Sequence, residues 1–262
     1  MSVRLRRRDD PRRARGLHCT ELELAAPNVL PAHDGLTIAH LSDLHVASRR
    51  APRALHHAVR LANAAKPDLV ALTGDYVCFS AKRLDALRRA LEPLSGPVVA
   101  VLGNHDHWTD PDAVQRALET LGITVLRNAH QTLMLRGEPF HVVGLDDNVT
   151  RNADVARAFE SVPAHGTRLA LSHDPNAADS LTDLDAALVL AGHTHGGQVR
   201  LPGITALLAK RAGLRYLAGL YDVKGMPLYV SRGLGQSVPL RIGARPELGL
   251  LRLRRAQLRL AI

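Results

Sequence analysis

Short apolar runs that stop abruptly at aspartate, asparagine or histidine recur along this chain. Residues 36–41, 68–72 and 97–102 are such runs, and stretches with helical spacing at 52–65 and 82–91 separate them. Continuous apolar runs are typical of strands covered on both faces, and strands alternating with helices favour a layered α/β fold. In such folds the active site lies at the carboxyl ends of the strands. The polar residues that end these runs are therefore candidate site residues.

The second half of the chain is richer in predicted strands. Helical patterns cover 112–121 and 154–159, and the apolar or alternating runs at 123–126, 132–135, 140–144, 168–171, 188–190, 228–230 and 248–253 predict strands. Hydrophobic residues make up 46% and charged residues 23% of the chain, as in ordinary soluble globular proteins. No repeat or linker divides it. We therefore expect one domain over residues 19–262.

Residues 1–18 differ from the rest in charge. Seven arginines against two aspartates give residues 1–16 a net charge of +5, more than half of the +9 of the whole chain. A solvated, disordered tail is expected, and contact with nucleic acid or anionic lipid is the alternative. No apolar stretch has the length of a signal peptide or a membrane span. The chain is therefore predicted to be cytoplasmic, with peripheral membrane contact as an alternative.

Five predicted strands end in side chains that can bind a metal. In chain order these residues are Asp43 and His45, Asp75, Asn104 and His105, His173, and His193 and His195. Each alone has an ordinary explanation, such as a helix cap, a turn or a core histidine. Two histidines two residues apart project to the same side of an extended chain, and neutral imidazole is the commonest metal ligand. Five coincident endings favour a metal site.

The order of these motifs resembles the calcineurin-like metallophosphoesterases over roughly residues 36–253. They run Asp-x-His, Gly-Asp, Gly-Asn-His-Asp, a lone histidine and Gly-His-x-His. The Leu-Ser-Asp-Leu-His of residues 41–45, the Gly-Gly-Gln of 196–198 and the Val-Ser-Arg-Gly-Leu-Gly of 230–235 are similar to bacterial phosphodiesterases of the YkuE/YaeI type. The resemblance implies an α/β (α+β) fold, a four-layer α-β-β-α sandwich with two mixed sheets and a metal site at the strand carboxyl ends.

The resemblance also implies ligands for two divalent metal ions. It puts the first ion on Asp43, His45 and His195. It puts the second on Asn104, His173 and His193, with Asp75 bridging both. The two aspartates offset only half of the charge of two divalent cations, so positive charge remains to attract a phosphate. Mixed imidazole, carboxylate and amide ligands are compatible with Mn²⁺, Fe or Zn²⁺, and Mn²⁺ is the expected ion.

Catalytic and substrate-binding roles extend beyond the ligands. The resemblance implies that His105 protonates the leaving oxygen, with Asp106 as a candidate residue to orient it. Trp108 is a candidate for stacking on a base, although simple loop packing would also explain it. Arg232 or Arg241 is a candidate for binding a second phosphate, unless these arginines are merely solvated.

The residues after Gly74 and Asp75 differ from the pattern of one branch of the family. Cys78 stands where the phosphoprotein phosphatase branch has an acidic residue, which argues against a protein phosphatase. Cys78 is expected to be a packed small residue rather than a reactive thiol. Residues 204–212 form a short apolar segment with a basic end, either a core helix or a contact for an acyl chain or bilayer surface.

The predicted function is metal-dependent hydrolysis of a phosphoric ester, by a phosphodiesterase or pyrophosphohydrolase. Some relatives of the YkuE/YaeI type are associated with cleaving UDP-2,3-diacylglucosamine, which makes a nucleotide-sugar lipid a candidate substrate. The alternatives are a phosphomonoesterase, a nucleic-acid-binding protein that uses the arginine-rich tail, and a non-catalytic scaffold. A phosphoester substrate is expected as partner, with no requirement for nucleic acid or an obligate protein partner.

Overall fold

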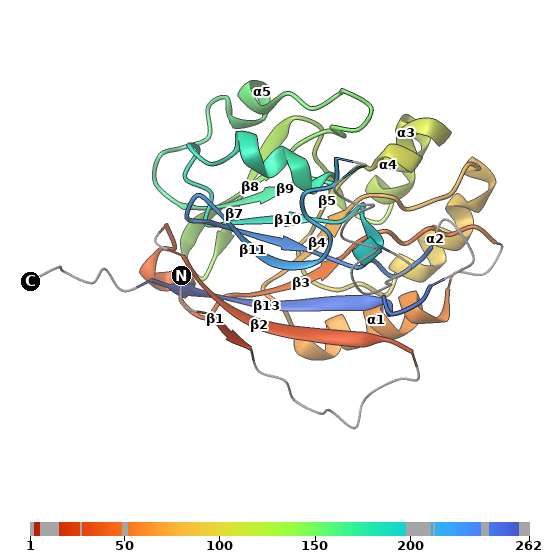
Figure 1. Cartoon of the computed structure of the whole chain (residues 1–262), viewed down its shortest axis with the longest axis horizontal. Coiled ribbons are helices and arrows are strands. Elements are labelled where there is room, and N and C mark those ends of the chain that lie inside the picture. Colours follow the sequence, from red (N-terminus) through yellow and green to blue (C-terminus); the bar gives the residue numbers. More distant parts are fainter. Residues whose placement is uncertain are drawn as a thin grey trace, which may run out of the picture.

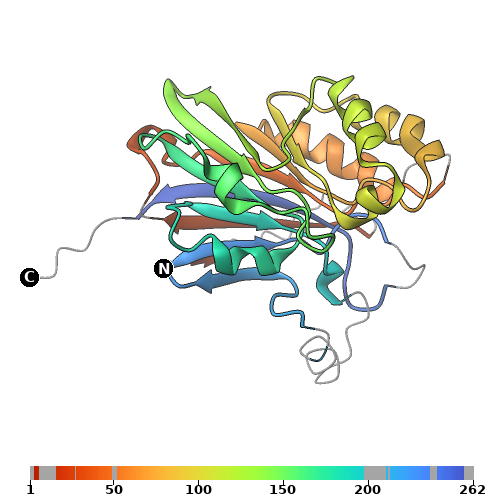
Figure 2. The same ribbon diagram turned by 90° about the horizontal axis from the view of Figure 1, so that it is seen from above.

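Two stacked sheets form the centre of the molecule in the computed structural model, which describes residues 3–5, 16–26, 28–48, 52–197, 211, 213–236 and 241–256. The strands of both sheets run along a common direction (Figures 1 and 2). Such aligned stacking buries the inner faces of both sheets in one core.

The first sheet has seven strands within the described part of the chain. In spatial order they are β1 (Val3–Leu5), β2 (His18–Ala26), β13 (Glu247–Arg255), β3 (Thr37–Leu41), β4 (Leu69–Thr73), β5 (Val98–Val101) and β6 (Thr124–Val125). Strands β3 to β6 are parallel, whereas β13 is antiparallel to β3. The carboxyl ends of β3, β4 and β5 therefore share one edge of the sheet.

The second sheet has six strands among the described residues. In spatial order they are β11 (Gly219–Val223), β12 (Met226–Val230), β10 (Leu188–Ala191), β9 (Thr167–Leu171), β8 (Glu138–Gly144) and β7 (Ala129–Leu135). Strands β8, β9, β10 and β12 are parallel, and the antiparallel β7 and β11 border them. Both sheets are therefore mixed, as the resemblance implied.

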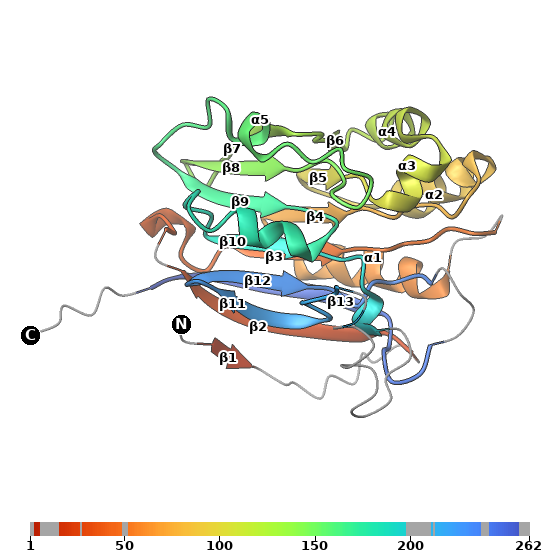
Figure 3. The same cartoon turned by 45° about the horizontal axis from the view of Figure 1, so that its top comes forward.

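Helices cover the outer faces of both sheets. The helices α1 (Arg53–Ala65), α2 (Leu84–Leu91) and α4 (Pro111–Glu119) pack on the first sheet, where Leu55, Leu87 and Val114 belong to one buried cluster. The second sheet is covered by α5 (Val155–Phe159) and the 3₁₀ helix η3 (Pro175–Ser180). Figure 3 shows α5 over β7 and β8, away from α2 and α4. The four-layer prediction is confirmed.

The amphipathic pattern explains the helices that the sequence predicted. In α1 the buried residues Leu55, Ala58, Val59 and Ala62 repeat at helical spacing and form one apolar face. The helix ends at Ala65, and the next residue, Lys66, caps it with a left-handed φ of 47°, just before Pro67. The predicted stretch 82–91 covers all of α2 and most of η2 (Ala81–Arg83). Sequence alone did not indicate the short elements η1 (Pro31–His33), α3 (Asn104–Thr109) and η4 (His195–Gly197). These have too few residues for a periodic pattern.

Part of the predicted tail is described. Val3–Leu5 form β1, which pairs antiparallel with β2, and the side chain of Leu17 is buried just before β2 begins at His18. Residues 1–2 and 6–15 of the tail, and 204–212 except Arg211, lie outside the described residues. The division at residue 18 stays a prediction. None of the helices among the described residues is long and apolar enough to cross a membrane.

Candidate metal centre

The predicted ligands all follow the carboxyl ends of adjacent strands. Asp43 and His45 follow β3, Asp75 follows β4, Asn104 follows β5 and begins α3, His173 follows β9, and His193 and His195 follow β10. The first three strands belong to one sheet and the last two to the other, so the site forms where the two sheets meet. All seven residues are buried except His193, which is partly buried. The structure therefore brings together every ligand that the sequence suggested.

Four of these residues form one donor cluster. The donor atoms of Asp43, His45, Asp75 and His195 all lie within 4.8 Å of one another. His195 Nε2 is 2.9 Å from His45 Nε2 and 3.4 Å from Asp43 Oδ1. Donors that share an ion at bond lengths of about 2.1 Å are themselves roughly 3–3.5 Å apart. This cluster fits one divalent ion.

A second cluster adjoins the first through Asp75. Asn104 Oδ1 lies 2.9 Å from His193 Nδ1 and 3.1 Å from His173 Nε2. Asp75 Oδ2 is 3.3 Å from His173 Nε2 and 3.5 Å from His45 Nε2. One carboxylate oxygen thus lies between the two clusters. The donor set fits two ions that share Asp75.

The backbone at the ligands is unusual. The five ligands with a positive φ are Asp43 (51°), His45 (43°), Asp75 (56°), His193 (70°) and His195 (51°). Residues other than glycine rarely adopt this left-handed region, and such strain concentrates at functional sites. Backbone bonds hold it in place: the amide of Asp43 donates to Gly74 O and the amide of His45 donates to Asp75 O. These turns direct the side chains of Asp43 and His45 toward the other candidate ligands.

Gly192 allows Asp43 to reach its position. A Cβ at residue 192 would lie 1.9 Å from Ser42 Oγ and 2.4 Å from Asp43 Oδ2. Such a clash cannot be relieved without moving the ligand, because both neighbours are buried.

Gly192→Ala is therefore expected to lower the free energy of unfolding by about 1–3 kcal/mol and to reduce metal content. Chemical denaturation and metal analysis measure the two effects. Asp85→Ala, at an exposed position on α2, is the control and should change neither quantity. Full metal content in Gly192→Ala would contradict the packing argument.

Burial sets the protonation of the cluster. It lowers the pKa of His45 to about 3 and the pKa values of His193 and His195 below their ordinary value, so these rings are neutral near pH 7. Burial alone would raise the pKa of Asp75, but the adjacent His173 and His45 lower it below the ordinary range. Neutral imidazoles and ionised carboxylates are the forms that bind metal.

His173 differs from the other histidines. Burial lowers its pKa, but the Asp75 carboxylate outweighs this and raises the pKa well above the ordinary value. A cation that binds between His173 and Asp75 would displace the proton that this pair holds. His173 Nδ1 is 2.7 Å from Thr73 O, which leaves Nε2 facing Asp75.

Asp106, predicted to orient His105, contacts backbone amides rather than the ring of His105. Its carboxylate is fully buried and accepts hydrogen bonds of 2.9 Å from the backbone amides of Asp75, Tyr76 and Gly103. It makes no hydrogen bond to the ring of His105, whose buried Nδ1 has no hydrogen-bond partner among the described residues. Consecutive residues of a helix project about 100° apart, so the two side chains of α3 face different ways. Asp106 holds the loop that carries Asp75.

Asp106→Ala is expected to lower the free energy of unfolding by about 3 kcal/mol, because three amides would lose their acceptor in a buried place. Urea denaturation measures this loss. Asp85→Ala, at an exposed aspartate on α2, should change stability little. If Asp106→Ala kept its stability and lost only activity, the predicted role of Asp106 in orienting His105 would be supported instead.

His105 lies at the edge of the cluster. Its backbone amide donates to Asp75 Oδ1 at 2.9 Å. Its ring centroid is 4.8 Å from those of His45 and Phe79 and 5.0 Å from that of Trp108. Ring contacts therefore position His105, while Nδ1 has no partner in the part of the chain that the structure describes. Nε2 also makes no hydrogen bond to a described residue and, unlike Nδ1, is not among the buried atoms, so it is the ring nitrogen available for a substrate atom.

Cys78 contacts the candidate ligand His45, which the sequence did not indicate. Its Sγ lies 2.9 Å from His45 Nδ1, on the side of the ring opposite the donor cluster. Burial and the nearby Asp75 charge raise the pKa of Cys78 to about 12, so it is a thiol rather than a thiolate near neutral pH. It is thus not a ready nucleophile. A partner at the second ring nitrogen fixes the orientation of a metal-binding histidine.

The predicted substrate residues lie at different places. Trp108 is 55% exposed and adjoins His105. The Nε of Arg232 lies 3.9 Å from Glu247 Oε2, and its backbone amide donates to the same carboxylate. Arg241 instead reaches the cluster, with Nη2 3.1 Å from His195 Nδ1. Sequence reasoning missed Phe79, and its only signal was its closeness to Asp75 in the chain.

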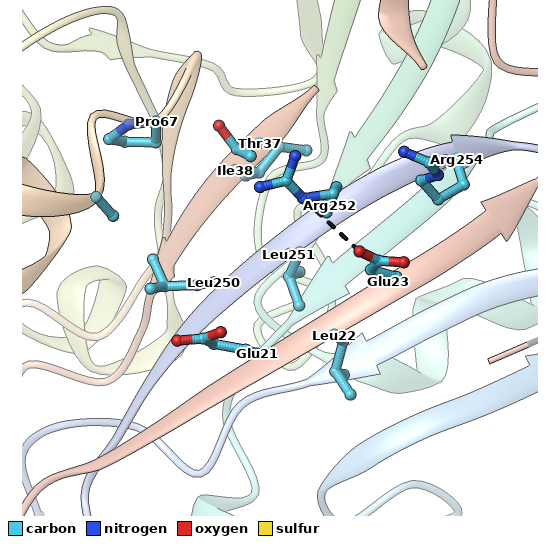
Figure 4. A pocket seen from close by; sticks show the side chains of 11 residues that line it. Glu21, Leu22, Glu23, Thr37, Ile38, Pro67, Leu250, Leu251, Arg252 and Arg254 are labelled. Atoms are coloured by element: carbon cyan, nitrogen blue, oxygen red, sulfur yellow. Dashed lines mark ion pairs between the residues drawn. The ribbon is translucent and has the colours of Figure 1, made fainter. Parts of the chain in front are cut away.

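A groove of about 460 Å³ lies elsewhere, on β2, β3 and β13 (Figure 4). It contains Thr37, at the amino end of β3, whereas the donor cluster follows the carboxyl end. Arg252 and Glu23 form an ion pair of 4.0 Å there. The groove is therefore distinct from the metal centre.

Comparisons with known proteins agree with this geometry. Residues 36–197 match the calcineurin-like phosphoesterase family model. The chain is 35% identical over 223 residues to phosphodiesterase YaeI of Escherichia coli, and the aligned stretch covers 82% of this chain and 81% of the relative. It is 26% identical over 292 residues to UDP-2,3-diacylglucosamine pyrophosphatase LpxG of Chlamydia trachomatis, covering 90% and 89%. The crystal structure of TT1561 of Thermus thermophilus has a TM-score of 0.51 at 14% identity, covering 75% and 88%, and shares the fold.

Proposed function

Because the chain belongs to the calcineurin-like phosphoesterase family, whose members are metal-dependent hydrolases, we propose that it hydrolyses a phosphodiester or pyrophosphate bond. The observation that carries the proposal is the pair of donor clusters that share Asp75. A relative named as a phosphodiesterase and another named as a pyrophosphatase support the choice of bond.

The ligand assignment follows the two clusters. Asp43, His45 and His195 would hold one divalent ion, and Asn104, His173 and His193 the other, with Asp75 between them. When bound, the two ions supply positive charge for the phosphate and lower the pKa of a water molecule. Mn²⁺ is the proposed ion, because no thiolate donor favours a softer metal. Cys78 stays a thiol behind His45 and does not alter this choice.

His105 is the proposed general acid. Its Nε2 lies at the edge of the cluster, makes no hydrogen bond to a described residue and, unlike Nδ1, is not buried, so it can give a proton to the leaving oxygen. A positioned acid of this kind contributes roughly 10²–10⁴-fold in rate. The guanidinium of Arg241 beside His195 adds positive charge on the other side of the cluster. Buried ligands exclude bulk water, which strengthens these charges.

The proposal also names a class of substrate. The name of LpxG makes a nucleotide-linked pyrophosphate such as UDP-2,3-diacylglucosamine a candidate. Trp108, exposed beside His105, supports a substrate with a flat group. A second phosphate at Arg232, a cytoplasmic location and peripheral membrane contact stay predictions from the sequence.

A substrate panel tests the proposal. The purified chain is assayed with bis(p-nitrophenyl) phosphate, p-nitrophenyl phosphate and UDP-2,3-diacylglucosamine, with Mn²⁺, Zn²⁺ and Mg²⁺ in parallel. We expect turnover of the diester or the pyrophosphate, highest with Mn²⁺. A preference for the monoester would favour a phosphomonoesterase. No turnover with any metal, in protein that binds two ions, would favour a non-catalytic scaffold.

A further inference from the structure

Two exposed aromatic side chains flank His105. Phe79 is 66% exposed and Trp108 is 55% exposed, although large apolar side chains are usually buried. The ring centroid of Phe79 lies 4.8 Å from that of His105 and the centroid of Trp108 lies 5.0 Å from it, with interplanar angles of 65° and 64°. Phe79 comes from the loop between β4 and η2, whereas Trp108 belongs to α3. Two elements thus each place an aromatic ring on the same histidine.

Packing does not account for Phe79. Its φ is 49°, in the left-handed region, where a bulky residue is an outlier. The strained backbone turns the ring outward to solvent and toward His105 rather than into the core. Strain of this kind is retained where the surroundings impose it, and it concentrates at functional sites. Phe79 stands four residues after Asp75, in the same loop.

The position of His105 fixes where a leaving group must lie. A general acid needs the leaving oxygen within about 2.6–3.2 Å of its ring nitrogen. The His45 ring closes the inner side of His105, with centroids 4.8 Å apart at 90°. The remainder of the leaving group must therefore extend outward, across the two exposed rings.

We propose that Phe79 and Trp108 form the leaving-group subsite and that it takes a flat aromatic or heteroaromatic group. The inference rests on the proposed function, because it uses the role of His105. Aromatic rings bind flat groups through their faces and edges, and stacking on such a platform is tolerant of the exact ring. The rings thereby determine which side of the substrate departs.

Fluorescence gives a test that needs no turnover, because Trp108 is the single tryptophan of the chain. The protein loaded with Mn²⁺ is titrated with phenylphosphonate and methylphosphonate, which are not hydrolysed. We expect phenylphosphonate to bind about 5- to 100-fold more tightly and to change the Trp108 emission. Phe79→Ala should remove most of this preference and leave methylphosphonate binding unchanged. Phe79→Leu, which keeps the apolar volume without the ring, should remove part of it.

Met134→Ala is the matched control. Met134 is 67% exposed on β7 and pairs with Pro139, near the amino end of β8 and away from the strand ends that carry the ligands. Equal affinity for the two phosphonates, or binding of neither, would overturn the inference. A Phe79→Ala protein that loses affinity for both by the same factor would also overturn it, because the ring would then only position His105. A failed substrate panel with an intact phenyl preference would contradict the proposed function and not the subsite.

Discussion

Asp75→Ala is expected to lower kcat/KM by about 10³-fold or more and to reduce bound metal below two ions per chain. Asp75 Oδ2 is 3.5 Å from His45 Nε2 and 3.3 Å from His173 Nε2, so one side chain contributes to both clusters. Loss of a residue that only orients a ligand typically costs 10–100-fold in metal affinity or activity, and loss of a shared ligand should cost more. Elemental analysis and steady-state kinetics with Mn²⁺ measure the two effects.

Asp75→Asn keeps the shape of the side chain but removes its negative charge, so it separates the two contributions. The amide oxygen can still bind one ion, so we expect this variant to retain more metal than Asp75→Ala while its activity stays low. Asp85→Ala, at an exposed position on α2, is the control and should bind two ions. Two tightly bound ions in an active Asp75→Ala protein would exclude Asp75 as the shared ligand.

The candidate ligands, which the structure brings together, could be predicted because each signal is local. Asp43, Asp75 and His173 each come within three residues of the end of an apolar run. Parallel strands bring the carboxyl ends of β3 and β4 to one edge of the first sheet, and those of β9 and β10 to one edge of the second. The same reasoning predicted α1, whose apolar face repeats along the sequence. The two mixed sheets and their stacking came from the resemblance rather than from any periodicity, and the order of the strands was not predicted.

The sequence could not predict two kinds of feature: the direction in which a side chain points, and contacts between residues that are far apart in the sequence. The helix α3 has six residues, Asn-His-Asp-His-Trp-Thr, without an apolar repeat. Without that helix, Asp106 looked like a partner of His105, whereas the helix turns it toward the Asp75 loop. The contact of Cys78 with His45 and that of Arg241 with His195 join residues far apart in sequence. Only the tertiary fold sets such pairs.

His105→Ala is expected to lower kcat by roughly 10²–10⁴-fold while two metal ions remain bound. Its ring contacts His45 at a centroid distance of 4.8 Å but belongs to neither donor cluster of the proposed assignment, so its removal should leave the ligands in place. Steady-state kinetics and elemental analysis on the same preparation separate this effect from the effect of Asp75→Ala, which should lower both activity and metal content.

A comparison of two leaving groups shows whether His105→Ala has lost proton donation. p-Nitrophenolate departs without protonation, whereas an alkoxide needs a proton in the transition state. The defect of His105→Ala should therefore be at least about 10-fold larger for an alkyl diester than for bis(p-nitrophenyl) phosphate. His105→Asn, which can donate a hydrogen bond but cannot deliver a proton, should show the same dependence. An equal defect for both leaving groups would mean that His105 only binds the phosphate. The subsite of Phe79 and Trp108 would then be supported by the phosphonate affinities alone.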